Sequence, residues 1–248
     1  MTLVKLQRVG KRFDQLTALS DIDLSVEQGE FVSLVGPSGC GKSTILRLIA
    51  GLTQPTDGEI RWSAREADHR IGFVFQEPTL MPWASVETNV RLPLDLQGDT
   101  SGTADKVRDV IARVGLDGFE RAMPGELSGG MKMRASLARA LITSPSLLLL
   151  DEPFAALDEI TRFKLNDDLL SLWQNGRWTV VFVTHSVYEA VYLSNRVIVM
   201  TPRPGLVAED IAIDVPYPRT ESFRADPVYH EYCRRLSAKL RDVMRAAA

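Results

Sequence analysis

The sequence predicts an α/β protein built around a parallel β-sheet. Five short apolar runs, rich in β-branched residues, look like strands buried on both faces, and most of them are followed by a helix signal. They are residues 31–35, 71–75, 147–150, 180–183 and 197–200. Strands that alternate with helices favour a parallel sheet, because parallel neighbours need a crossover connection. The 248 residues, 45% of them apolar, are enough to bury such a core.

Apolar and polar residues alternate near the N-terminus. Ile22, Leu24 and Val26 are separated by polar residues, which predicts a strand with one wet face at an antiparallel edge. We therefore expect residues 1–76 and 144–215 to form an α/β core that carries this antiparallel β edge.

Helices are expected directly after two of the core strands. Residues 43–50 predict a helix that stops at Gly51, a common residue after a helix. After the strand at 180–183, Ser186 and Glu189 have the spacing of a capping box, which opens a helix.

Residues 77–143 contain no strong strand signal and are predicted to be a helical insertion. Four of their apolar residues recur at i, i+3, i+4 and i+7 just before Gly115. These are Val107, Val110, Ile111 and Val114. The insertion begins at 77–83, where two prolines predict a boundary loop.

Residues 216–248 are predicted to be a tail that ends in an amphipathic helix. Prolines interrupt its first part, and apolar residues then recur at helical spacing between basic residues. The apolar set is Tyr229, Tyr232, Cys233, Leu236, Leu240 and Val243. The basic face is either solvated or a contact surface.

Composition excludes several classes of protein. The chain has 29 Lys and Arg against 32 Asp and Glu, a net charge of −3, so we expect no nucleic-acid partner. Cys40 and Cys233 are the only cysteines in the sequence, which fits a reducing compartment and provides no disulfide framework. No apolar run reaches the roughly 18 residues of a membrane span, and the first residues lack the pattern of a secretory signal. The expected address is therefore cytosolic.

A phosphate-binding motif lies between the strand at 31–35 and the helix after it. The pattern G-x-x-x-x-G-K-[ST] is matched by Gly36, Pro37, Ser38, Gly39, Cys40, Gly41, Lys42 and Ser43. Glycines let backbone N–H groups surround a triphosphate at a helix N-terminus. Lys42 would contact the β- and γ-phosphates, and Ser43 would bind Mg²⁺. The alternative is a glycine-rich turn that carries Lys-Ser by chance.

Polar residues follow three other strands at the edge where ligands of a parallel sheet bind. Asp151 is a candidate Mg²⁺ ligand, and Glu152 is a candidate general base for the attacking water. His185 could hydrogen-bond a γ-phosphate oxygen and that water, and Gln76 could contact Mg²⁺ or water. The alternatives are a helix-capping acid pair and a structural histidine.

A second anion site is predicted where Ser128, Gly129 and Gly130 open a helix. The expected helix places three apolar residues on one face: Met133, Leu137 and Leu141. One chain already has its phosphate-binding loop, so a second such site requires an explanation.

Together these motifs resemble the ATPase subunit of an ABC transporter. Walker A at 36–43, the Q-loop at Gln76, the signature at 127–130, Walker B ending at Glu152, the D-loop and the H-loop occur in the family's order. The resemblance implies a P-loop NTPase fold: a RecA-like parallel-sheet core, an N-terminal antiparallel β subdomain and a helical signature subdomain at 77–143.

The resemblance also implies ATP and Mg²⁺ as cofactors, and a homodimer. Two subunits would enclose two ATP molecules, each between one chain's Walker A and the partner's signature residues. Further nucleotide contacts carried over from the family are Phe13, which would stack on adenine, Thr44 after Walker A and Asp158 of the D-loop.

The chain is more closely similar to the nitrate, sulfonate, taurine and bicarbonate import ATPases. The likeness rests on Walker A, on the run 79–83 (Thr-Leu-Met-Pro-Trp) and on Met131, where Gln is usual. It implies a bacterial-type importer in which a separate permease docks near Gln76 to Trp83 and works with a solute-binding protein. The ATPase would then lie on the cytoplasmic face of the inner membrane, held there by the permease.

Other interpretations remain at this point. Trp83 and Leu80 could simply pack in the core of the insertion. A soluble P-loop kinase for a small molecule would explain Walker A but would leave 127–130 unexplained. A non-transport ABC ATPase acting on DNA or ribosomes would be expected to have a basic surface or a longer chain.

Overall fold

The computed structural model describes residues 1–63, 70–98, 102–176 and 178–246. The chain divides into two compact units, one formed by residues 1–68 and 177–248 and the other by residues 69–176. Each unit is described by itself. We call them the loop unit and the signature unit, after the phosphate-binding loop and the signature helix that they carry.

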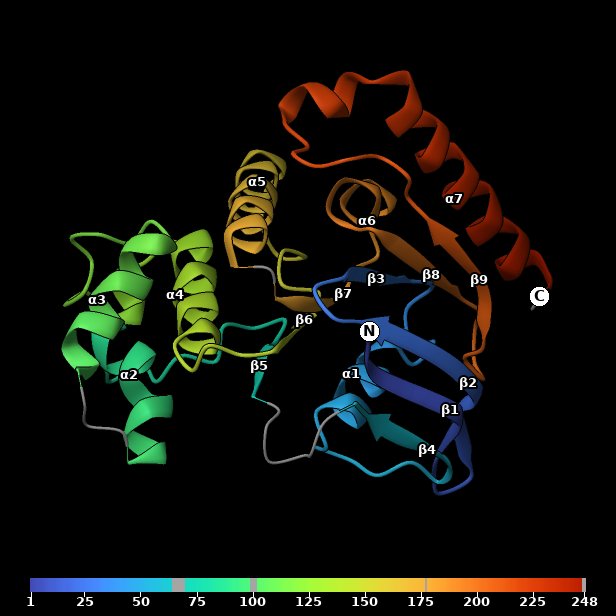
Figure 1. Ribbon diagram of the computed structural model, residues 1–248, viewed down its shortest axis with the longest axis horizontal. Coiled ribbons are helices and arrows are strands. Elements are labelled where there is room, and N and C mark those ends of the chain that lie inside the picture. The colour runs from blue at the N-terminus through green and yellow to red at the C-terminus, as the bar shows by residue number, and fades with distance from the viewer. Residues whose placement is uncertain (64–69, 99–101, 177, 247–248) are drawn as a thin grey trace. The chain divides into compact units, whose positions relative to one another are not determined.

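The loop unit contains an antiparallel three-stranded sheet in the order β2-β1-β4 (Figure 1). Its strands are β1 (Thr2–Phe13), β2 (Leu16–Glu27) and β4 (Asp57–Trp62). Val4 pairs with Val26 and Leu6 with Leu24, and these side chains are buried. The alternation along residues 21–26 therefore gave the correct strand and the correct buried face.

A second sheet of the loop unit positions the phosphate-binding loop. Its strands are β3 (Phe31–Val35), β7 (Thr179–Val183), β8 (Arg196–Met200) and β9 (Val207–Ala212), in the order β7-β3-β8-β9. β3 is parallel to β7 and to β8, which confirms three predicted parallel strands. β9 runs antiparallel to β8 and was not predicted.

Helices cover this sheet on both faces (Figure 1). They are α1 (Lys42–Ile49), α6 (Val187–Leu193) and α7 (Pro227–Ala246), with a 3-10 turn, η3 (Glu221–Ala225). α7 is the predicted amphipathic helix. It buries Tyr229, Cys233 and Leu236, while Arg235 and Lys239 form ion pairs with Glu209 of β9.

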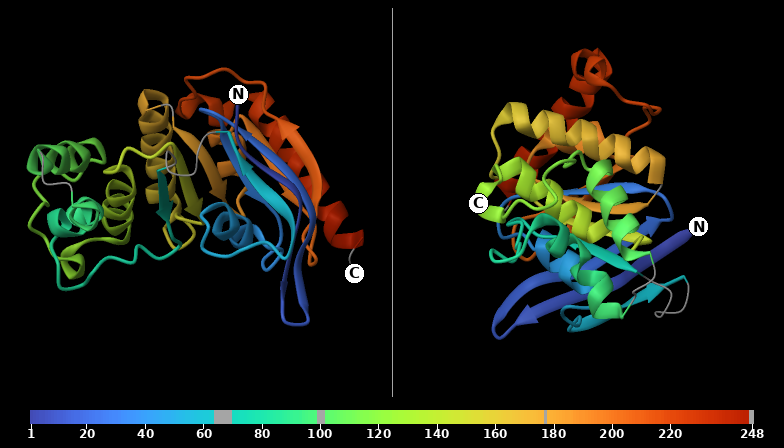
Figure 2. Two further views of the ribbon diagram at one scale, coloured as in Figure 1. Left: turned by 60° about the horizontal axis from the view of Figure 1, so that its bottom comes forward. Right: turned by 90° about the vertical axis from the view of Figure 1, so that its left-hand side faces the viewer.

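The signature unit has two parallel strands and a cluster of helices, drawn in green and yellow in both views of Figure 2. Its elements are β5 (Ile71–Val74), α2 (Val86–Gln97), α3 (Thr103–Arg113), η2 (Pro124–Glu126), α4 (Gly129–Leu141), β6 (Leu147–Asp151) and α5 (Glu159–Gly176).

The predicted helix face in the signature unit is confirmed, because Val107, Val110, Ile111 and Val114 are all buried. The predicted loop at 77–83 contains no helix or strand. This unit holds residues 77–143 together with β5, β6 and α5, and the predicted subdomain boundaries stay a prediction. No helix in the described part of the chain combines a length and a hydropathy compatible with spanning a bilayer.

Candidate functional site

The loop between β3 and α1 carries the predicted phosphate-binding motif in the expected strand–loop–helix context. Gly41 is the N-cap of α1, and it offers no side chain to cap the helix. The first turn of α1, which is fully described, carries no acidic residue. The positive end of the helix dipole is therefore not offset locally, which suits an anionic ligand.

Gly41 is the residue of this loop whose conformation most requires glycine. Its φ is 101°, in the left-handed region, and a Cβ there would lie 2.4 Å from the Cδ2 atom of Leu19. The turn into α1 thus depends on the missing side chain.

Lys42 brings a buried positive charge into the loop. Its side chain is 5% exposed, and its Nζ atom donates hydrogen bonds to the carbonyl oxygens of Gly36 (2.9 Å) and Pro37 (3.1 Å). An ammonium group bonded to its own loop can exchange these carbonyls for phosphate oxygens, which are charged and stronger acceptors. Together with the N–H groups of the helix terminus, this donor set fits a triphosphate.

Cys40 belongs to the loop and is fully buried. Its Sγ atom is 3.8 Å from Nζ of Lys42, but burial dominates and raises the pKa of the Cys40 thiol. The residue is therefore an uncharged filler of the loop at neutral pH.

His185 follows β7 after one residue and is exposed. The capping box predicted after it forms only in part. The Oγ atom of Ser186 accepts a hydrogen bond from the N–H of Glu189 (3.3 Å), but the Glu189 carboxylate bonds the hydroxyl of Thr184. In a full capping box the Ser186 N–H would donate to the Glu189 carboxylate. Here it donates to the Thr184 hydroxyl instead (3.0 Å).

Phe13, the predicted adenine contact, ends β1 with its ring 46% exposed. Nζ of Lys11 lies 4.9 Å from the ring centroid. An exposed ring next to a cation is a suitable surface for a planar base.

In the signature unit, Gln76 and Asp151 lie at the carboxyl ends of two paired strands: Asp151 ends β6, and Gln76 comes two residues after β5. β5 pairs with β6 so that Val74 lies opposite Leu150, and Asp151 is the last residue of β6. Asp151 is buried, whereas Gln76 is exposed. Glu152 has a φ of 46°, a conformation that is costly for a residue other than glycine. Strain of this kind clusters at functional sites.

Ser128 caps α4, as predicted, by accepting a hydrogen bond from the N–H of Met131 (3.3 Å). A Cβ on Gly130 would lie 2.9 Å from Cγ2 of Thr161 in α5. Asp158 caps that helix by accepting a hydrogen bond from the N–H of Thr161 (2.9 Å), which is the main reason that the pKa of the Asp158 carboxyl is lowered. A Cβ on Gly129 would lie 3.2 Å from Cδ2 of Leu157 in the D-loop, so the signature and the D-loop are in contact within this unit.

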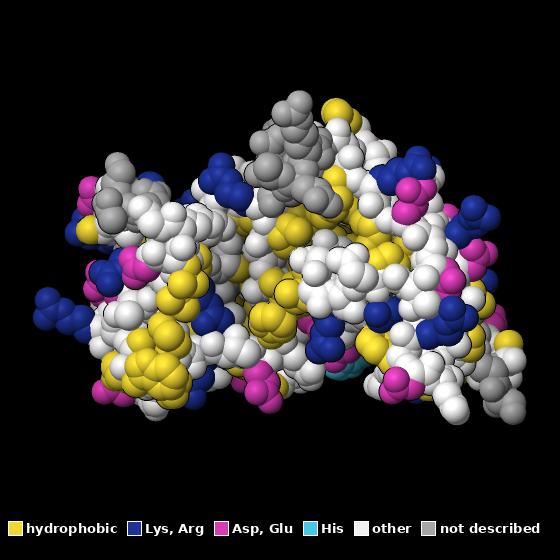
Figure 3. All heavy atoms as spheres, turned by 90° about the horizontal axis from the view of Figure 1, so that it is seen from below, with side chains coloured by type: hydrophobic (Ala, Val, Ile, Leu, Met, Phe, Trp, Pro, Cys, Tyr) yellow, Lys and Arg dark blue, Asp and Glu magenta, His cyan; other side chains and the backbone are white. Residues whose placement is uncertain are grey.

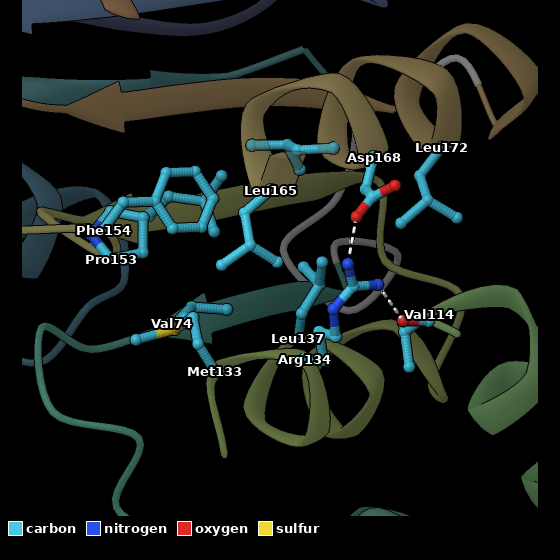
Figure 4. Close-up of a pocket in the computed structure, with 12 residues that line it drawn as sticks. Val74, Val114, Met133, Arg134, Leu137, Pro153, Phe154, Leu165, Asp168 and Leu172 are labelled. Atoms are coloured by element: carbon cyan, nitrogen blue, oxygen red, sulfur yellow. Dashed lines mark hydrogen bonds and ion pairs between the residues drawn. The ribbon is translucent and has the colours of Figure 1, made fainter. Parts of the chain in front are cut away.

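Arg134 was not identified from the sequence. It projects from α4, pairs with Asp168 of α5 and donates a hydrogen bond to the carbonyl oxygen of Val114, as Figure 4 shows. Apolar side chains, among them Met133 and Leu165, line the small pocket beside it. This arginine ties the signature helix to its neighbours. Its position on an otherwise apolar helical face was the available signal.

Comparison with known proteins identifies the family of this chain. The ABC transporter family model matches residues 19–155. The aliphatic sulfonates import ATP-binding protein of Bacillus cereus is 43% identical over 226 residues, 88% of this chain and 89% of that protein. An uncharacterized ABC transporter ATP-binding protein of Methanocaldococcus jannaschii is 45% identical over 249 residues, 96% of this chain and 91% of that protein.

Solved structures agree with these relatives. The dimeric structure of MJ0796, a bacterial ABC transporter cassette, covers 86% of this chain and 100% of its own with 33% identity and a TM-score of 0.75. A post-hydrolysis state of the same cassette, bound to ADP and Pi, gives a TM-score of 0.74. The chain belongs to the ABC transporter family and is an ATP-binding ATPase of that family. The predicted fold class, family and enzyme class are confirmed.

Proposed function

We propose that this protein is the ATPase subunit of an importer that powers uptake of a small solute through a separate membrane permease. Nitrate, a sulfonate, taurine or a similar small solute is the proposed cargo. The observation that carries the proposal is an exposed groove in the signature unit, lined mostly by apolar and partly by basic residues, which includes Phe75, the residue before Gln76. An importer ATPase needs such a surface, because it must pass its motion to another protein.

The groove has a volume of about 500 Å³ and is lined by residues of β5, α2 and α4. Phe73 and Phe75 contribute stacked rings 4.3 Å apart, and Leu96 is 79% exposed. Exposed apolar clusters of this kind suit docking of another protein. Seen from below in Figure 3, hydrophobic side chains gather on the surface of the helical part of the molecule.

Trp83 gives independent support for docking near the loop at 77–83. Its side chain is 76% exposed, so it is not part of the core of the helical insertion. Leu80 is half-buried. A large aromatic side chain left in water at this loop is consistent with an interface anchor.

The loop residues are proposed to bind the phosphates of ATP. Backbone N–H groups at the start of α1 and the ammonium of Lys42 supply the donors. The remaining proposed phosphate contacts are Pro37, Ser38 and Gly39 of the loop and Thr44 in the first turn of α1. Phe13 is proposed to stack on adenine. A second copy of the chain would add Ser128, Gly129, Gly130 and Asp158.

Mg²⁺ is the proposed metal, held by Ser43, Asp151 and Gln76. Hydroxyl, carboxylate and amide oxygens are suitable donors for this ion. When bound, Mg²⁺ would neutralise charge on the phosphates. The described residues include no cluster of three or more His, Cys, Asp or Glu side chains that could hold a metal alone. The proposed set therefore depends on oxygen donors from separate elements.

Hydrolysis is assigned to Glu152 and His185. The Glu152 carboxylate is proposed to take a proton from the attacking water, and His185 to orient that water and the terminal phosphate. The subunit would act at the cytoplasmic face of the inner membrane, held by its permease, which receives solute from a binding protein. Nucleic acid has no part in this function.

The test of the catalytic assignment is Glu152→Gln. Turnover should fall about 10²-fold or more, because the general base is lost, while ATP still binds. Glu231→Gln makes the same chemical change on the exposed surface of α7 and serves as the control. Near-normal turnover in Glu152→Gln would remove Glu152 from this role.

The test of the importer assignment is the complex itself. Affinity purification from detergent-solubilised membranes should recover an integral permease with the wild-type chain, and Trp83→Ser or Leu96→Ser should release it without lowering the basal ATPase rate. Met244→Ser removes another exposed apolar side chain, on α7, and should retain the permease. A permease held equally by all three variants would contradict docking at this surface.

A further inference from the structure

The segment between β8 and β9 lies directly against the phosphate-binding loop. The N–H of Gly205 donates to the carbonyl oxygen of Ala18 (3.0 Å), and the N–H of Ser20 donates to the carbonyl oxygen of Gly205 (3.1 Å). A Cβ on Gly205 would lie 2.0 Å from the carbonyl oxygen of Cys40, so the two backbones are in contact. This segment, residues 201–206, therefore packs against the backbone of the loop at Cys40.

Arg203 reaches from this segment to the phosphate-binding loop itself. Its Nε and Nη2 atoms lie 3.3 and 3.1 Å from the carbonyl oxygen of Gly39, and both donate hydrogen bonds to it. The segment that carries Arg203 is itself braced by Thr201, whose hydroxyl accepts a hydrogen bond from the N–H of Leu206 (2.9 Å) and donates to the carbonyl oxygen of Pro204 (3.1 Å). The guanidinium therefore projects from a fixed base.

This contact determines how one peptide plane of the loop is turned. The carbonyl of Gly39 and the N–H of Cys40 belong to the same planar trans peptide and point in opposite directions. With the carbonyl held by Arg203, the N–H of Cys40 points across the loop, where it donates to the carbonyl oxygen of Pro37 (3.3 Å). The peptide between Gly39 and Cys40 is thus held at both ends, by Arg203 at its carbonyl and by Pro37 at its N–H, which fixes the shape of the loop.

We propose that Arg203 is a positioning residue of the phosphate-binding loop, a role that rests on the proposed function of this loop as the ATP site. It acts through Gly39 and the Cys40 peptide rather than by contact with the reacting atoms. An arginine suits this task because its planar guanidinium can direct two N–H groups at a single carbonyl oxygen, whereas a lysine offers one point of contact.

The first test is binding of the fluorescent analogue TNP-ATP to the purified chain. Arg203→Ala should weaken affinity about five- to tenfold, the size expected for the loss of charge-assisted bonds. Arg203→Lys should lie between the alanine variant and the wild type. Arg234→Ala removes the same charge from the exposed surface of α7 and should bind as the wild type does.

The second test follows the loop without any nucleotide. Cys40 and Cys233 are both buried thiols of the loop unit, so peptide-resolved labelling with N-ethylmaleimide measures the loop and an internal control in one sample. Arg203→Ala should speed labelling of Cys40 about fivefold or more by loosening its peptide, and should leave Cys233 unchanged.

Three outcomes would overturn the proposal. Faster labelling of both thiols would mean general loosening of the fold, and weaker binding without faster Cys40 labelling would mean a simple charge effect. Wild-type behaviour of Arg203→Ala in both tests would mean that Arg203 has no role in the loop. If the wild-type chain fails to bind TNP-ATP, the proposed ATP site is wrong. The labelling test still decides whether Arg203 holds the loop in that case.

Discussion

Replacement of Arg219 by methionine should destabilise the fold far more than replacement of an exposed arginine. The side chain is 5% exposed, and its guanidinium donates hydrogen bonds to five backbone carbonyl oxygens. These belong to Val191, Tyr192, Ser194, Ile213 and Val215, at distances of 2.9–3.3 Å. Arg219 thereby closes the C-terminal end of α6, where a cation is favoured by the helix dipole.

The magnitude follows from those acceptors. A buried carbonyl that loses its donor costs about 1–3 kcal/mol, but the sum is reduced because carbonyls keep other partners and because methionine avoids burying a charge. We expect a net loss of about 3 kcal/mol. Since a folded domain has about 5–15 kcal/mol of stability in total, this loss is a large share of it.

Urea unfolding followed by circular dichroism measures this loss. With a slope of about 3 kcal/mol per molar urea, a loss of about 3 kcal/mol lowers the midpoint by about 1 M. Arg234→Met, at an exposed position of α7, should shift it by less than about 0.2 M. Arg219→Lys should recover only part of the loss, because one ammonium cannot serve five acceptors that lie on two segments. Equal midpoints for Arg219→Met and Arg234→Met would refute the argument.

Three further outcomes are expected. Lys42→Ala should weaken nucleotide binding itself, and unchanged affinity in a titration would contradict the loop as the phosphate site. Gly41→Ala should weaken TNP-ATP binding at least about tenfold, because a Cβ would meet Leu19, whereas Gly51→Ala, at a φ of 71° with open space around it, should leave binding unchanged. The hydrogen bond from Arg235 is the main cause that lowers the pKa of Glu209. The ionised Glu209 therefore contributes to stability, by less than about 1 kcal/mol, above about pH 4.5, and this contribution is lost as the pH falls through the lowered pKa of the folded state. The urea midpoints of wild type and Glu209→Gln should therefore differ at pH 7 and converge in acid.

The elements that the sequence predicted well are those whose signal is local. β3, β7 and β8 are short apolar runs bounded by turn residues, and their burial on both faces follows from their place inside a parallel sheet. α3 was predicted because four apolar residues of one face lie within two turns. No knowledge of the rest of the chain is needed for such patterns.

β9 was missed because it depends on a distant partner. Its residues, Val207–Ala212, alternate only weakly, and all but one of them are half-exposed or exposed at the edge of the sheet. What makes this segment a strand is its pairing with β8, across a turn that contains two prolines. The partial capping box at Ser186 has a local cause instead, since the Thr184 hydroxyl bonds both the Ser186 N–H and the Glu189 carboxylate.

The site shows the same division. Lys42, Ser128 and Asp151 could be proposed from short motifs, because their chemistry needs only a loop, a helix start or a strand end. Arg203 and Arg219 carry no motif, because each bonds carbonyl oxygens that are distant in the sequence, Gly39 for Arg203 and Ser194 for Arg219. Long-range roles of this kind follow from three-dimensional contacts and not from spacing along the chain.

Glu152 combines both kinds of information. Its place at the end of an apolar strand predicted a catalytic carboxylate, but only the structure gives its φ of 46°. A conformation that costs about 1 kcal/mol or more persists where the surrounding structure enforces it. Here β6 ends at the buried Asp151, and the chain must turn at the next residue to continue toward α5. This turn places Glu152 directly after the strand end, where a glycine would fit the backbone better but would lack the carboxylate that we propose as the base.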